Sequence, residues 1–158
     1  MKNRLLKIVF SFLLVAFLCP AVAYSVPADV TDISDNKYFD AVHSSLEKAK
    51  DSIYVSLYGI IISEQDKLSL PYLLLQDLIN AHKRGVKVVV RLDRSYDYLA
   101  AGKTGELSPR NEVAYMMLTE SGIDCRFTIP DRTLHDKLIV IDGETVIEGS
   151  MNWSTSAL

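Results

Sequence analysis

Apolar residues recur at helical spacing in three stretches of the chain, which predicts three helices. The first covers residues 36–50, the second begins at Pro71 and ends at Gly85, and the third begins at Ser108–Pro109 and ends at Gly122. Proline is favoured in the first turn of a helix and glycine directly after the last turn, so these residues mark the ends of the two later helices.

Shorter stretches rich in β-branched residues predict five strands. These strands cover residues 52–58, 86–92, 123–129, 135–141 and 144–148. Between the last two lies Asp142–Gly143, a dipeptide typical of a tight hairpin turn. The polar stretches 60–69 and 93–107 predict loops. Since strands and helices alternate along most of the chain, the predicted fold class is α/β, with a mixed sheet flanked by helices.

The N-terminus has the pattern of a secretory signal. Three basic residues precede an apolar run over residues 8–18, which is short for a membrane span, and Ala21–Val22–Ala23 has the small–x–small pattern of a cleavage site. We therefore predict a signal peptide over residues 1–23, cleaved near Ala23, and a secreted or periplasmic protein. An uncleaved signal that anchors the chain in a membrane is the alternative.

The rest of the chain is predicted to form a polar leader over residues 24–35 and one domain over residues 36–158. Cleavage would leave 14 basic and 20 acidic residues, a net charge of about −6. A body this acidic excludes a general polyanion binder, so any phosphate site must be local. The one cysteine left, Cys125, lies in an apolar stretch and is predicted to be a small buried hydrophobe.

The C-terminal residues 152–158 resemble the beginning of a helix without its end. We therefore expect that the last elements of the domain are missing from this sequence.

One segment concentrates groups with chemical potential. His135 and Lys137 are two residues apart on a predicted strand and point to the same face. The hairpin then returns Gly149, Ser150 and Asn152 to the beginning of that strand. An imidazole, an ammonium, a hydroxyl and an amide should therefore converge, with Gly149 allowing close backbone approach and a helix beginning near Ser150.

These groups suit a phosphodiester. Lys137 and Asn152 can hold the non-bridging oxygens, Ser150 can add a hydrogen bond, and a neutral His135 can attack phosphorus. Neither a carboxylate cluster nor a second nearby histidine suggests a metal, so we expect no metal and no cofactor.

The spacing H-x-K-x4-D-x6-G-S-x-N over residues 135–152 resembles the signature of the phospholipase D superfamily. Residues 53–59 look like the first core strand of that family, and residues 74–93 look like its helix–strand unit. The resemblance extends over residues 36–158 and is greatest to the small single-motif bacterial members, which are secreted endonucleases or phospholipase D-like proteins.

The resemblance implies a role for each matching residue. His135, Lys137 and Asp142 form the catalytic set, in which His135 is the nucleophile and Asp142 is a structural member at the Asp–Gly turn. The implied phosphate-binding set is Lys137, Gly149, Ser150 and Asn152. In the family a glutamate beyond the motif bonds to the nucleophilic histidine, and this sequence stops before that position.

The single motif copy has a further implication. In the family a second histidine, from a second motif, protonates the leaving group. The resemblance therefore implies a homodimer with the active site at the two-fold interface.

The expected function is metal-independent phosphodiester hydrolysis through a phosphohistidine, on phospholipid headgroup esters or nucleic acid. Two alternatives stay open: a non-specific endonuclease, and a truncated inactive copy that only binds phosphate.

Other polar and aromatic side chains have simpler interpretations. His43 and His82 lie on predicted helices and are expected to be surface or packing residues. Tyr54 and Tyr58 alternate on a strand, where packing is favoured over a place beside the substrate. Trp153 follows the motif and is expected to pack beneath it.

Overall fold

The computed structural model describes residues 27–94, 110–129 and 132–158. The chain divides into two compact units, residues 1–32 and 33–158. In the first unit the described residues, 27–32, have no regular secondary structure, so every helix and strand below belongs to the second. The predicted signal peptide, most of the predicted loop at 93–107 and the predicted start of the third helix lie outside the described residues.

A five-stranded sheet with strand order β4-β3-β1-β5-β6 forms the centre of the second unit. Its strands are β1 (Ser52–Leu57), β3 (Lys87–Leu92), β4 (Asp124–Phe127), β5 (Lys137–Ile141) and β6 (Thr145–Glu148). Strands β1, β3 and β4 run parallel, whereas β5 is antiparallel to β1 and β6 is antiparallel to β5. The mixed sheet confirms the predicted fold class.

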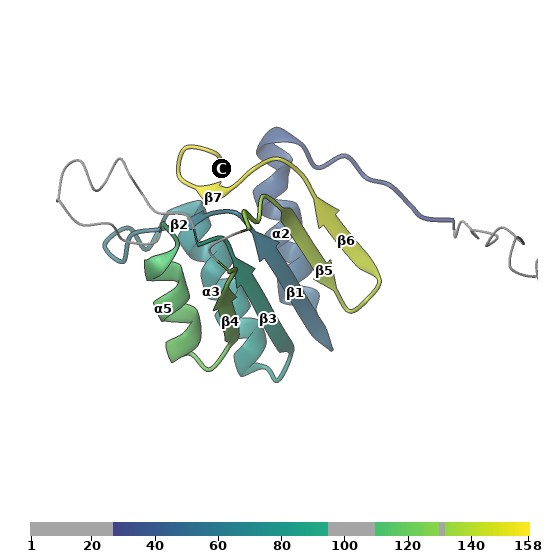
Figure 1. Ribbon diagram of the computed structural model, residues 1–158. Helices are drawn as coiled ribbons and strands as arrows, with labels where there is room; N and C mark the ends of the chain where they lie inside the picture. The colour runs from purple at the N-terminus through teal and green to yellow at the C-terminus, as the bar shows by residue number, and fades with distance from the viewer. Residues whose placement is uncertain (1–26, 95–109, 130–131) are drawn as a thin grey trace, which may run out of the picture. The chain divides into compact units, whose positions relative to one another are not determined.

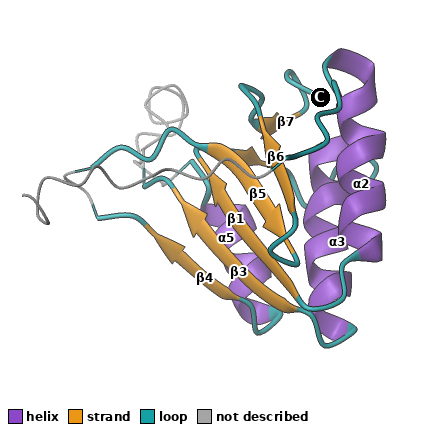
Figure 2. Cartoon of the chain, turned by 90° about the vertical axis from the view of Figure 1, so that its right-hand side faces the viewer, coloured by secondary structure: helices purple, strands orange, loops and turns teal. Residues whose placement is uncertain are grey.

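The α-helices of the described residues cover one face of this sheet, as Figures 1 and 2 show. They are α2 (Tyr38–Lys48), which follows the short 3-10 turn η1 (Asp35–Lys37), α3 (Leu70–Lys83) and α5 (Glu112–Glu120). Helix α3 connects β1 to β3, and α5 connects β3 to β4. Both crossovers move in the same direction across the sheet, so they place their helices on the same face.

The side chains of β1 alternate between the helix-covered face and the other face of the sheet. Ile53, Val55 and Leu57 of β1 are buried beneath the helices, whereas Tyr54 between them is 42% exposed on the other face. Burial raises the pKa of the Cys125 thiol to about 12, and this residue packs in the same core, as predicted. Within the described parts of the chain, no helix has the length and apolar character needed to cross a bilayer.

The two predicted helix ends at glycine are confirmed. Gly85 has a φ of +94° and Gly122 a φ of +85°, so both adopt the left-handed conformation that follows the last turn of a helix. Side chains with a Cβ atom rarely adopt this conformation, which is why glycine marked these positions in the sequence.

Two predictions of secondary structure were wrong. Ile60–Ile61, predicted as loop, form strand β2, and Trp153–Ser154, predicted as the start of a helix, form strand β7, which pairs with β2 in parallel. A single turn follows, in which the N–H groups of Ala157 and Leu158 donate to the carbonyl of Ser154.

The reason is the burial of Trp153. Its side chain is fully buried, and its indole N–H donates to the Tyr38 hydroxyl at 3.1 Å. Its backbone N–H donates to the carbonyl of Gly59 at 2.9 Å. A helix of a few residues is marginal by itself, so burial of the largest side chain decides the conformation. The expectation that Trp153 packs in the core is confirmed.

Candidate active site

His135 and Lys137 lie side by side where β5 begins. The Lys137 Nζ atom donates to the backbone carbonyl of His135 at 2.9 Å and lies 3.4 Å from Nδ1 and 3.3 Å from Nε2 of the His135 ring. Lys137 is 6% exposed, whereas His135 is exposed to solvent. The structure thus brings the predicted imidazole and ammonium together, with the imidazole exposed and the ammonium buried beside it.

The aromatic ring of Tyr58 completes the wall of this site. Its centroid lies 4.8 Å from that of the His135 ring, and the two planes are tilted by 53°. The Lys137 Nζ atom lies 5.1 Å from the Tyr58 centroid, within the range of a cation–π contact. The ring therefore touches both members of the H-x-K motif, although the sequence favoured a simple packing role.

A second cation reaches the same ring from another element. The guanidinium carbon of Arg110 lies 5.3 Å from the Tyr58 centroid, and Nη1 donates to the Tyr58 hydroxyl at 3.2 Å. Two cations thus lie about 5 Å from the centre of one ring. Sequence reasoning missed Arg110, because no motif connects it to Tyr58.

Asn152 packs against the turn that carries Tyr58. A Cβ atom on Gly59 would lie 3.4 Å from Cγ and 3.5 Å from Oδ1 of Asn152. The Asn152 Oδ1 atom is buried and has no hydrogen-bond partner within the described residues. An unpaired buried acceptor costs roughly 1–3 kcal/mol, so a donor such as a water molecule or a hydroxyl group would stabilise the site.

Gly149 and Ser150 lie where the hairpin returns. The Gly149 N–H donates to the carbonyl of Lys137 at 3.3 Å, which places it beside the start of β5. Both residues are exposed, so the Ser150 hydroxyl is accessible to a ligand. Gly149 lies outside regular secondary structure and Ser150 lies in a bend, so the expected contribution of a helix N-terminus does not arise at these residues.

Asp142 lies at the opposite end of β5 from His135. Its carboxylate accepts the backbone N–H groups of Lys50, Asp51 and Ser52 at 3.0, 2.8 and 2.9 Å. These N–H groups, that of Ser52 first, hold the pKa of Asp142 below its usual range. The structure thus places this member of the predicted catalytic set away from the imidazole, where it ties the β5–β6 turn to the start of β1.

A buried polar pair lies behind the site. Asn111 is 0% exposed; its Oδ1 accepts from the Ile60 N–H at 2.7 Å, and its Nδ2 donates to the carbonyls of Tyr58 at 2.9 Å and Asp93 at 2.8 Å. The Asp93 carboxylate accepts the N–H of Leu134 at 2.7 Å. This pair ties together the segments that carry Tyr58 and His135, and the sequence contains no local pattern that reveals it.

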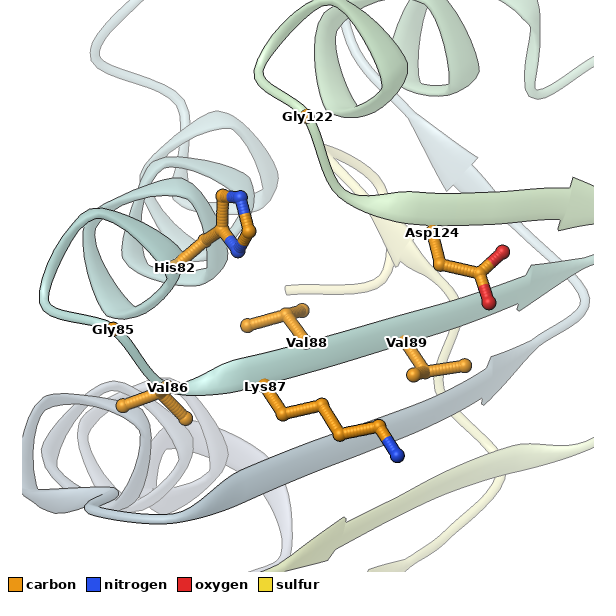
Figure 3. Close-up of a pocket in the computed structure, with 8 residues that line it drawn as sticks. All are labelled: His82, Gly85, Val86, Lys87, Val88, Val89, Gly122 and Asp124. Atoms are coloured by element: carbon orange, nitrogen blue, oxygen red, sulfur yellow. The ribbon is translucent and has the colours of Figure 1, made fainter.

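The other two histidines of the chain lie elsewhere. His43 on α2 bonds to Asp77 on α3 at 2.7 Å, which links two helices, as expected of a packing residue. His82 lines a hollow of about 300 Å³ near the N-terminal end of β3, together with Lys87 and Asp124. Figure 3 shows the His82 ring between α3 and Gly122. This hollow contains none of the predicted site residues.

Across residues 27–94, 110–129 and 132–158, no three His, Cys, Asp or Glu side chains are grouped so that they hold a metal ion.

The chain is similar to known proteins over most of its length. The family model described as "Cardiolipin synthase, PLD-like domain" matches residues 42–158. A phospholipase D of Rickettsia typhi is 38% identical over 112 residues, which cover 71% of this chain and 45% of the relative. A mitochondrial cardiolipin hydrolase of Xenopus tropicalis is 29% identical over 137 residues, which cover 83% of this chain and 60% of the relative.

A solved structure has a related fold. The phospholipase D family member Nuc from Salmonella typhimurium superposes with a TM-score of 0.56 and 27% sequence identity, over 75% of this chain and 66% of that protein. The chain spans about half the length of the phospholipase D relatives that it matches.

Proposed function

Since this chain belongs to the family of phospholipase D-like domains, we propose that it is a phosphodiester hydrolase whose active site is built around His135 and Lys137. The observation that carries the proposal is the position of the Lys137 ammonium, 3.3–3.4 Å from both ring nitrogens of an exposed imidazole. A fixed cation beside a nucleophile suits a reaction in which negative charge develops on phosphate oxygens.

The proposed reaction has two steps. A neutral His135 ring nitrogen attacks phosphorus, a P–N bond forms, and the bond from phosphorus to the leaving alcohol oxygen breaks. Water then attacks the phosphohistidine, so that the P–N bond breaks and a phosphomonoester is released. Lys137 stabilises the non-bridging oxygens in both steps, while the exposed Ser150 and the amide of Asn152 supply further polar contacts.

The leaving alcohol needs a proton, and we propose that it comes from His135 of a second copy. His43 bonds to Asp77 between two helices, and His82 lines the hollow near the other end of β3, so neither is placed to serve as the acid. A homodimer with its two-fold axis at the active site would bring two exposed imidazoles together. One would act as nucleophile and the other as acid, so the rate should have a bell-shaped dependence on pH.

The decisive experiment compares the purified protein with H135N on bis(p-nitrophenyl) phosphate. We expect turnover by the wild type, about 1,000-fold or greater loss in H135N, wild-type activity in the matched control H43N, and full activity in EDTA. A ³¹P signal of phosphohistidine after rapid acid quench would support the covalent step. Loss of activity in EDTA, or activity retained in H135N, would contradict the mechanism.

The substrate class is decided by parallel assays. A phospholipid headgroup ester and a nucleic acid carry the same diester, so we propose that the natural substrate is one of these two. Release of a headgroup from phosphatidylcholine vesicles, or nicking of plasmid DNA, distinguishes them. If the protein turns over neither and sediments as a monomer, it is an inactive phosphate-binding copy.

The proposed site of action is outside the cytoplasm. The basic, apolar and small-residue pattern of residues 1–23 supports export followed by cleavage near Ala23. N-terminal sequencing of protein recovered from the medium or periplasm would test this, and an intact Met1 in the membrane fraction would indicate an anchor instead.

A further inference from the structure

Two consecutive residues hold Tyr58 from its two ends. Arg110 Nη1 donates to the phenolic oxygen at 3.2 Å, and Asn111 Nδ2 donates to the backbone carbonyl at 2.9 Å. The Asn111 amide is itself fixed, because its other N–H donates to Asp93 and its oxygen accepts from Ile60. A tyrosine bonded at both its backbone and its ring tip has little freedom to turn.

This ring is the surface against which the nucleophile rests. The His135 centroid lies 4.8 Å from the Tyr58 centroid, and the other contact of the imidazole comes from the Lys137 ammonium. His135 is otherwise exposed to solvent, so these two contacts restrain the direction of its ring.

We propose that Tyr58, clamped by Arg110 and Asn111, is the positioning residue that orients the His135 ring for attack on phosphorus. The inference rests on the proposed function for its catalytic consequence. In-line attack depends on the direction of the nucleophile, and a displacement of about 1 Å lowers a rate by about 100-fold. The Tyr58 ring orients the imidazole without a hydrogen bond to either imidazole nitrogen, so one His135 nitrogen stays available to attack phosphorus.

Substitution of Tyr58 tests this directly, with Tyr54 as the matched control. Tyr54 lies on β1, four residues before Tyr58 in the chain, and also has a cation over its ring, the Lys87 Nζ at 5.5 Å. We expect Y58L to lower kcat on bis(p-nitrophenyl) phosphate about 100-fold while KM changes less than about threefold. Y54L should leave both constants within about twofold. Equal effects of Y58L and Y54L would overturn the proposal.

The clamp itself is tested by a double-mutant cycle. Y58F keeps the ring but loses the bond to Arg110, and R110Q loses the same bond from the other side, so each should lower kcat about fivefold. If Arg110 acts through Tyr58, the double variant should be no slower than either single variant. If the fold-losses in kcat of the two single variants multiply in the double variant, Arg110 acts on the substrate and not through Tyr58, and the proposed clamp is rejected.

A measurement without turnover separates this inference from the proposed function. The Cε1–H signal of His135 in the NMR spectrum should shift in Y58L, because the aromatic ring beside it is lost, and should stay in place in Y54L. If the His135 signal shifts in Y58L but the wild type hydrolyses no diester, the contact between Tyr58 and His135 is supported and the proposed hydrolase function is rejected. An unchanged signal in Y58L would reject the positioning role whatever the activity. If Y58L does not fold, the Y58F and R110Q cycle decides.

Discussion

The Asp93 carboxylate accepts the backbone N–H of Leu134 at 2.7 Å, one residue before the proposed nucleophile. Asp93 directly follows β3 and is 3% exposed, so this bond is made inside the protein. It connects the end of a central strand to the segment that leads into β5. The position of His135 therefore depends on a residue 42 positions earlier in the chain.

Asp93→Ala should lower both stability and activity. The substitution removes the acceptor of the part-buried Leu134 N–H, so we expect the free energy of unfolding to fall by about 1 kcal/mol and kcat to fall about tenfold. Asp93→Asn keeps an acceptor oxygen and should lose less of both. Urea unfolding and kinetics on the same samples check this, and an Asn variant as poor as the Ala variant would argue against the bond to Leu134.

Mixing subunits tests the proposed dimer. If each active site needs His135 from both copies, a dimer with one H135N subunit is inactive. After subunit exchange in an equal mixture, about a quarter of the dimers should be active, so the activity per wild-type subunit should fall to about half. Activity that stays proportional to the amount of wild-type protein would show that one chain supplies all that the reaction needs.

The link between α2 and α3 should make stability depend on pH. The hydrogen bond to Asp77 raises the pKa of His43 above its ordinary value of 6.5. As the pH rises, the unfolded chain therefore loses the His43 proton at a lower pH than the folded protein does. The contribution of the pair is therefore complete below about pH 6.5 and is lost as the pH rises through the folded-state pKa.

Thermal unfolding of the wild type and H43Q at several pH values measures this effect. The difference in Tm between the two proteins should be greatest near pH 6 and should shrink towards about pH 8. D77N should show the same loss of this pH dependence, since it removes the other member of the pair. A difference that grows with pH would contradict the assignment.

The contribution of Asp142 to stability should have the opposite pH dependence, because it should be lost as the pH falls. Its pKa is lowered by three backbone N–H groups, so its contribution to folding is present above the unfolded-state value of 3.8 and is lost as the pH falls through the lower folded-state pKa. D142A should therefore be less stable than the wild type at neutral pH, and the gap should close in acid.

The control for Asp142 lies in the same turn. Glu144 is exposed, so E144Q should change the free energy of unfolding by no more than about 0.5 kcal/mol at any pH. Kinetics on D142A add a second test, because Asp142 is remote from the imidazole. A loss of kcat without a loss of stability would return Asp142 to the catalytic set.

Much of the fold and part of the site could be read from local patterns. The five strands of the central sheet and the helix ends at Gly85 and Gly122 follow from periodicity and backbone freedom. His135 and Lys137 lie side by side, as their two-residue spacing predicts, although β5 begins at Lys137 and His135 precedes it. Each of these depends on residues close in sequence, whose local conformational preferences are similar from one protein to the next.

The remaining features depend on which distant segments meet. The contacts of Tyr58 with Arg110 and Asn111, the pairing of β2 with β7, and the three N–H groups around Asp142 each join residues at least 50 positions apart. Such contacts leave no periodic signal, because the free energy that selects them comes from burial and hydrogen bonding in the folded chain. The candidate chemistry of the motif could thus be predicted from residues close in sequence, whereas the contacts that hold the imidazole in place arise from tertiary packing.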